Sequence, residues 1–133
     1  MNTLLPRSVP WTVLVICVPG LVGCDDSPKE RLAGRWVGER IEAFAPAQAE
    51  RALGWARDAF FEFKGSQVTV GIPAERPRTG TFEVAQAEEN ALSLVFRRPQ
   101  GTTDRVAMRF EGDDRLRWML PDGRSIVLRR DVE

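Results

Sequence analysis

The chain of 133 residues contains no histidine and no tyrosine, and it has only two cysteines. Without histidine there can be no Ser-His-Asp or Cys-His triad and no histidine zinc site. Carboxylates, lysines and hydroxyls remain, but the paired acids Glu88-Glu89 and Asp113-Asp114 lie at expected turns, where acids favour solubility and local hydrogen bonds. We therefore expect neither an enzyme, nor a metal site, nor a cofactor.

A long apolar run is also missing. The stretch from Val9 to Val22 contains Pro10, Pro19 and Gly20, and it is shorter than the roughly 20 apolar residues that a membrane-spanning helix needs. It follows a polar start that carries Arg7, which is the anatomy of a secretory signal peptide. Residues 1–23 are therefore predicted to be a cleaved leader.

The leader ends in Leu21-Val22-Gly23-Cys24, which resembles the lipobox of bacterial lipoproteins. The resemblance implies cleavage before Cys24, diacylglycerol on its thiol, and attachment to a membrane of the bacterial envelope. Asp25 directly after the cysteine resembles the signal that keeps enteric lipoproteins in the inner membrane. The alternative is an ordinary secreted protein with one unpaired thiol, which would be a liability in an oxidising compartment.

The mature chain is nearly neutral. Arg7 is the only charged residue of the leader, so 18 of the 19 basic residues and all 19 acidic residues remain after cleavage. Nucleic acid is therefore not expected as a partner, because phosphate neutralisation needs a basic excess. Residues 24–31 are expected to form a lipidated tether, and residues 32–133 are long enough for one domain.

Period-two alternation of apolar and polar residues dominates from Gly34 onward and predicts about eight strands, each with one buried face. Short turns join them, and Asp122-Gly123 is the strongest hairpin signal. Between the first two strands, Pro46 to Arg57 predicts a short helix with Ala49, Leu53 and Ala56 on one face. The simplest arrangement is an antiparallel up-and-down meander closed into a barrel, which leaves no exposed edge.

Three segments carry a second resemblance: Leu32-Ala33-Gly34-Arg35-Trp36, a Phe-x-Phe strand followed by Lys64-Gly65-Ser66, and a last strand that ends in Arg129-Arg130. Together they resemble small bacterial lipocalin-like lipoprotein domains. The resemblance implies a lipocalin-like barrel in which Trp36 closes one end beneath an arginine of the last strand. Arg130 shares the inward parity of Leu128 and is the expected partner.

Strand parity also predicts what fills the interior. Seven aromatic residues have inward parity, which are Trp36, Phe61, Phe63, Phe82, Phe96, Phe110 and Trp118. Their bulk favours a filled core over a pocket of the roughly 300 Å³ that a ligand needs. The segment with Phe44 and Trp55 occupies the place of the mouth-covering loop in lipocalins. If a ligand enters, we expect it there.

Strand parity places five arginines on the outside of the barrel, which are Arg97, Arg105, Arg109, Arg117 and Arg129. Their side chains could face anionic lipids or an acidic protein. Alternatively, acidic residues on neighbouring strands, such as Glu111, pair with them. Two functions stay open. The filled core favours a non-catalytic protein-interaction or accessory module of the envelope. The alternative is binding of a small hydrophobic ligand or acyl chain at the barrel mouth.

Overall fold

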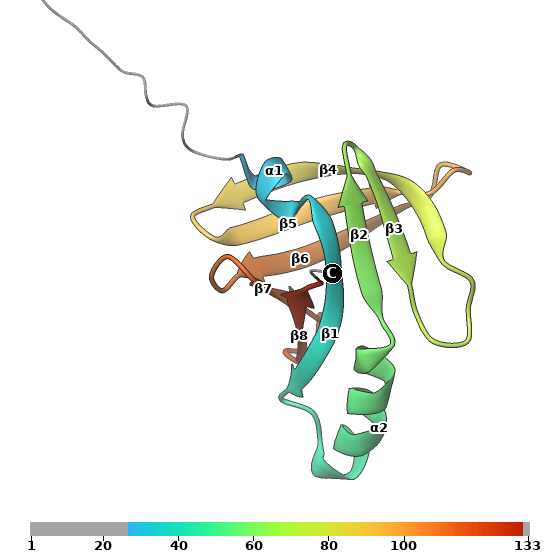
Figure 1. Ribbon diagram of the computed structural model, residues 1–133, viewed down its shortest axis with the longest axis vertical. Helices are drawn as coiled ribbons and strands as arrows, with labels where there is room; N and C mark the ends of the chain where they lie inside the picture. Colours follow the sequence, from blue (N-terminus) through green and yellow to red (C-terminus); the bar gives the residue numbers. More distant parts are fainter. Residues whose placement is uncertain (1–26, 132–133) are drawn as a thin grey trace, which may run out of the picture.

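The computed structural model describes residues 27–131, whose strands form a closed antiparallel barrel (Figure 1). The elements are α1 (Pro28–Leu32), β1 (Gly34–Glu42), α2 (Pro46–Arg57), β2 (Phe60–Lys64), β3 (Gln67–Gly71), β4 (Arg78–Glu88), β5 (Ala91–Arg97), β6 (Thr103–Phe110), β7 (Arg115–Met119) and β8 (Ser125–Arg130). This confirms the predicted mainly-β fold, with eight described strands and one short helix between the first two.

Each strand pairs with the next along the chain, and β8 returns to pair with β1. The closing pair aligns Trp36 with Arg130 at one end and Glu42 with Ser125 at the other, with a bulge between Gly38 and Arg40. Closure satisfies the backbone groups that an open sheet would leave unpaired at its edges. All these pairings lie within residues 27–131.

The predicted inward parity matches the observed core. Six of the seven aromatic residues assigned to the interior are buried, and the seventh, Trp118, is half-buried. Phe63 contacts Phe82 edge to face, with ring centroids 4.9 Å apart. Each fully buried large apolar side chain contributes about 1.5–3 kcal/mol to folding. The packed core therefore fixes the strands that carry the connections at both ends of the barrel.

Helix α1 includes residues 28–31, which belong to the predicted tether of residues 24–31. The Ser27 hydroxyl accepts a hydrogen bond from the Glu30 N–H at 3.2 Å, and the Glu30 carboxylate accepts one from the Ser27 N–H at 3.1 Å. This capping box, with Pro28 in the first turn, starts a short helix that the sequence analysis did not predict. The ordered domain therefore begins earlier than residue 32.

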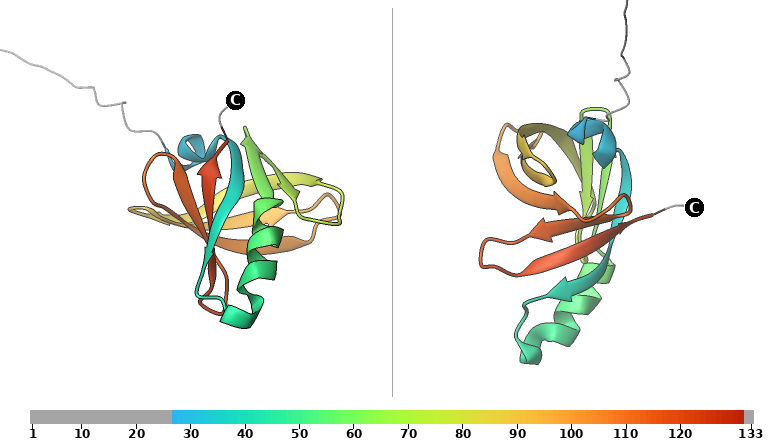
Figure 2. Two further views of the ribbon diagram at one scale, coloured as in Figure 1. Left: turned by 60° about the horizontal axis from the view of Figure 1, so that its bottom comes forward. Right: turned by 90° about the vertical axis from the view of Figure 1, so that its left-hand side faces the viewer.

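Helix α2 has the predicted bounds and continues through Gly54. Its buried residue, Ala56, packs on β1 at Gly38, where any Cβ atom would overlap the main chain of Ala56. A glycine in β1 therefore lets the helix approach the barrel wall. In Figure 2, α1 and α2 lie at opposite ends of the barrel.

We name the two ends of the barrel the closed end and the open end. The closed end comprises α1 and the connections at residues 65–66, 89–90 and 111–114. The open end comprises the connections at residues 43–45, 72–77, 98–102 and 120–124, with α2 beside it. Because successive strands run in opposite directions, every second connection falls at the same end.

Candidate functional site

At the closed end, Trp36 is fully buried under α1. Its indole N–H donates a hydrogen bond to the Leu32 carbonyl at 2.8 Å. The guanidinium carbon of Arg130 lies 4.2 Å from the centroid of the indole ring, which is a cation–π distance. The structure therefore brings together the two residues that the lipocalin-like resemblance assigned to barrel closure.

Arg130 also ties α1 to the last strand. Its Nη1 atom donates to the Ala33 carbonyl at 2.7 Å, and its Nη2 atom donates to the Arg31 carbonyl at 2.9 Å. These carbonyls end α1, where no further helical turn supplies donors. The closed end thus satisfies its own polar groups and leaves Trp36 no access to solvent.

The open end contains a cavity of about 750 Å³ between the connections at residues 72–77 and 98–102. Its apolar surface comes from inward-facing side chains of five strands, mainly Phe61, Val68, Val70, Phe96, Val106 and Trp118. Phe61 contacts both Phe96 and Trp118 edge to face, with centroids 6.1 and 5.0 Å apart. The interior is therefore filled near the closed end and hollow near the open end, in contrast to the filled barrel favoured by the count of aromatics.

Charged side chains border the apolar lining of the cavity at its rim. Arg98 makes two hydrogen bonds to the Asp104 carboxylate, at 3.0 and 3.3 Å. Arg78 forms a longer ion pair with Glu75 at 3.4 Å, between exposed side chains. Apolar walls with a few convergent polar groups are typical of small-molecule sites.

Sequence reasoning missed these rim residues, although a signal was present. Arg78 has the inward parity of Gly80 and Phe82, and Asp104 has that of Val106. An inward-facing charged residue is out of place in a filled core, because an isolated buried charge is expensive. Their parity therefore indicated a solvent-reachable interior at this end.

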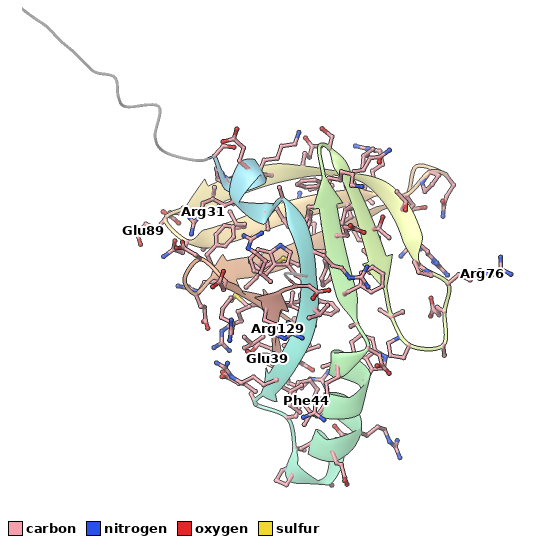
Figure 3. The ribbon with its side chains drawn as sticks, viewed as in Figure 1. Arg31, Glu39, Phe44, Arg76, Glu89 and Arg129 are labelled. Carbon is pink, nitrogen blue, oxygen red and sulfur yellow. The ribbon has the colours of Figure 1, made fainter. Side chains whose placement is uncertain are left out.

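Phe44 and Trp55, the predicted mouth residues, line a second and smaller cavity of about 340 Å³ at the same end. Phe44 lies in the connection between β1 and α2 (Figure 3), and the guanidinium carbon of Arg124 is 4.7 Å from its ring centroid. Trp55 is 36% exposed and contacts Trp118 at a centroid distance of 6.2 Å. Trp118 lines both cavities.

The predicted arginine surface is only partly unpaired. Arg117 is half-buried, and its guanidinium binds Glu111 and Glu42 and donates to the Ser125 hydroxyl. These hydrogen bonds lower the pKa of both carboxyl groups and raise that of Arg117. The expectation that Glu111 would neutralise part of this face fits the observed contact.

Several expectations fall outside the described residues or concern absences. The leader, its motif Leu21-Val22-Gly23, Cys24 and Asp25 all lie outside residues 27–131. Neither described helix is long and apolar enough to cross a bilayer. Within the same range, no three histidine, cysteine or acidic side chains cluster closely enough to suggest a metal site.

Comparisons of the chain with protein-family models, with curated proteins and with solved structures found no match. The eight-strand meander is consistent with the lipocalin-like barrel that the sequence resemblance implied.

Proposed function

We propose that the protein is a lipid-anchored, non-catalytic binding protein of the bacterial envelope, which takes a small hydrophobic ligand or acyl chain into the open end of its barrel. The single observation that carries this proposal is the open-end cavity of about 750 Å³ with aromatic and aliphatic walls. Cavities of about 300–1,000 Å³ are typical for small ligands. The predicted filled core had favoured a protein-interaction module over ligand binding, and the cavity leads us to place ligand binding first.

The short distance between Cys24 and α1 supports a defined orientation of the barrel on the membrane. Cys24 precedes the Ser27 cap by three residues, which span about 10 Å when fully extended. An anchor on Cys24 therefore keeps the closed end near the bilayer and turns the open end away from it. In this orientation the ligand enters from the aqueous side of the membrane that carries the anchor.

The residues that line the cavity support binding without turnover. They include no histidine or cysteine, and Asp104 is held by two hydrogen bonds from Arg98. We infer a binding role alone.

A cavity-filling variant tests the proposal. Val106 is half-buried and lines the cavity, whereas its neighbour Ala107 is exposed on the outer face of the same strand. Val106→Trp should abolish binding of phenylnaphthylamine, a neutral apolar fluorescent probe, to residues 25–133. Ala107→Trp adds the same ring outside the barrel and should leave binding unchanged. Thermal unfolding of both variants checks that the barrel is intact.

Native mass spectrometry of residues 25–133, prepared without detergent, provides a second readout. A lipid-sized mass that is lost in Val106→Trp and kept in Ala107→Trp would support the proposal. A bare polypeptide together with no probe binding in the wild type would overturn it. Loss of binding in both variants would also count against the open-end cavity as the site.

One observation favours the alternative, a protein-interaction surface. Arg105 and Arg109 are exposed on β6, and neither forms an ion pair with another described residue. Arg117, by contrast, is engaged by Glu42 and Glu111. Arg105→Glu with Arg109→Glu should abolish capture of an acidic envelope partner and leave folding unchanged. Unchanged capture would exclude this face.

A further inference from the structure

The two cavities at the open end have one lining residue in common, which is Trp118 of β7. The cavity of about 750 Å³ is lined by residues of β2 to β7 and of the connections at residues 72–77 and 98–102. The cavity of about 340 Å³ is lined by residues of α2, β7 and β8 and of the connections at residues 43–45 and 120–124. Trp118 therefore lies where the two cavities adjoin.

The ring of Trp118 reaches across the interior of the barrel. Trp118 aligns with Met108 on one side and with Ile126 on the other, and both of these side chains are buried in the core, so Trp118 has inward parity. Its ring meets that of Phe61 edge to face, with centroids 5.0 Å apart and the planes at 90°. Because β8 and β1 lie between β7 and β2 in the barrel, this contact joins strands that are not neighbours.

The contact between Trp118 and Phe61 marks the boundary between the two linings. Strands β3 to β6, on one side of it, contribute to the larger cavity, whereas β8 and α2, on the other side, contribute to the smaller one. Trp118 also contacts Trp55 of α2, with centroids 6.2 Å apart. Trp118 thus has an aromatic neighbour from each cavity, since Phe61 lines the larger and Trp55 the smaller.

The smaller cavity continues the apolar surface beyond Trp118. Its lining includes Phe44, Trp55, Leu120 and Ile126. Trp118 itself is half-buried, so its ring borders open space and not a packed core alone. Truncation of this one side chain would therefore connect two apolar spaces.

We propose that Trp118 divides one apolar site into two compartments and thereby sets the length of chain that the open-end cavity accepts. A chain that enters between the connections at residues 72–77 and 98–102 ends against the rings of Phe61 and Trp118, and the compartment beside Trp55 stays out of its reach. This inference rests on the proposed function, because it names the residue that determines ligand length in the same cavity. Removal of the indole joins the space of about 340 Å³ to the cavity.

The dependence of affinity on chain length tests this role. Straight-chain carboxylates from octanoate to hexadecanoate share one head group and are titrated into residues 25–133 by calorimetry, below their micelle concentrations. Wild-type affinity should rise about fourfold with each added methylene and then level off, once the end of the chain reaches Trp118. In Trp118→Ala the rise should continue for at least about two further methylenes, a gain of about fifteenfold for the longest chains.

Two further variants locate the gained space. Trp55→Ala enlarges the smaller compartment but keeps the Trp118 ring, so the chain length at which affinity levels off should equal that of the wild type. Ala52 is half-buried on α2 and lines the smaller cavity. Adding Ala52→Trp to Trp118→Ala refills this compartment and should restore the wild-type limit. Thermal unfolding checks each variant, and Trp118→Leu replaces Trp118→Ala if the latter does not fold.

The outcomes separate this inference from the proposed function. An affinity that rises through hexadecanoate in the wild type would overturn the length limit, whatever the variants do. The same limit in the wild type and in the truncated variant, or a longer limit that Ala52→Trp does not reverse, would overturn the division by Trp118 and leave the open-end cavity standing. Failure of every carboxylate to bind the wild type would overturn the proposed function itself.

Discussion

The closed end of the barrel leaves Trp36 with no exposed surface, whereas the open end leaves Trp118 half-buried beside a cavity of about 750 Å³. The difference lies in what covers each tryptophan. At the closed end, a helix and an arginine fastened to main-chain carbonyls lie over the ring. At the open end, Arg78 pairs with the Glu75 side chain and Arg98 with that of Asp104, beside the cavity. An arginine beside an aromatic residue can therefore close a barrel or border an entrance, depending on whether its partners are fixed main chain or exposed side chains.

The largest expected effect comes from removing the closed-end tryptophan. Trp36→Ala should lower the free energy of unfolding by about 3–5 kcal/mol, because the cavity left in a packed core is not refilled. Trp55→Ala is the matched change at the open end, where the ring is 36% exposed, and should cost about 1 kcal/mol or less. Urea unfolding measures both. Equal losses would contradict the distinction between the two ends.

A smaller loss is expected from the closing arginine. Arg130→Ala removes the hydrogen bonds to the Ala33 and Arg31 carbonyls and the contact with the Trp36 ring, and should cost about 2 kcal/mol. Arg129→Ala, one residue away and exposed on the outer face, should cost about 0.5 kcal/mol or less. Hydrogen exchange of α1 should speed up only in the first variant. Unchanged exchange there would show that Arg130 does not hold α1.

The smallest expected effect is a pH dependence of stability, which the ion pairs of Arg117 on the outer wall should cause and the arginine of the closed end should not. Arg117 holds the pKa of Glu42 and Glu111 below the ordinary carboxyl value of 4.5. Groups with a lowered folded-state pKa stabilise the fold above their unfolded pKa, and this contribution is lost as the pH falls through the folded pKa. Wild-type stability should therefore decline on acidification below about pH 4.5.

Arg117→Gln sharpens this pH test. The variant lacks the guanidinium that lowers both carboxyl pKa values, so its stability should decline less over the same acidic range. Arg130→Ala should keep the wild-type pH dependence, since the carbonyl partners of Arg130 do not titrate. A decline of equal size in the wild type and in Arg117→Gln would show that this network contributes nothing to acid sensitivity.

Much of the fold was predictable because alternation is a local property. The inward parity of Phe61, Phe63 and Phe82 follows from the sequence and is what the structure shows. The pairing of Trp36 with Arg130 came from the lipocalin-like resemblance together with parity. Helix α1 was missed because five residues are too short for a helical periodicity, although the spacing of Ser27 and Glu30 is a capping-box signal.

The cavity was harder to foresee. Seven inward aromatics suggested a filled interior, but three of them, Phe61, Phe96 and Trp118, line the wall of the cavity and leave space between them. The remaining space depends on how the connections at residues 72–77 and 98–102 diverge. Such loops carry no periodic pattern, so their paths are not encoded in a form that sequence reasoning can follow.

The sequence by itself carries the resemblance to a lipoprotein leader and lipobox, the near-neutral charge, the lack of histidine, and the alternation that predicts a closed meander. These follow from composition and from neighbours along the chain. Only the tertiary structure decided which end is covered, where the cavity lies, and which arginines are paired, such as Arg117 with Glu42 from a distant strand. The cover of the closed end and the Arg117–Glu42 pair depend on residues far apart in sequence that meet when β8 closes on β1.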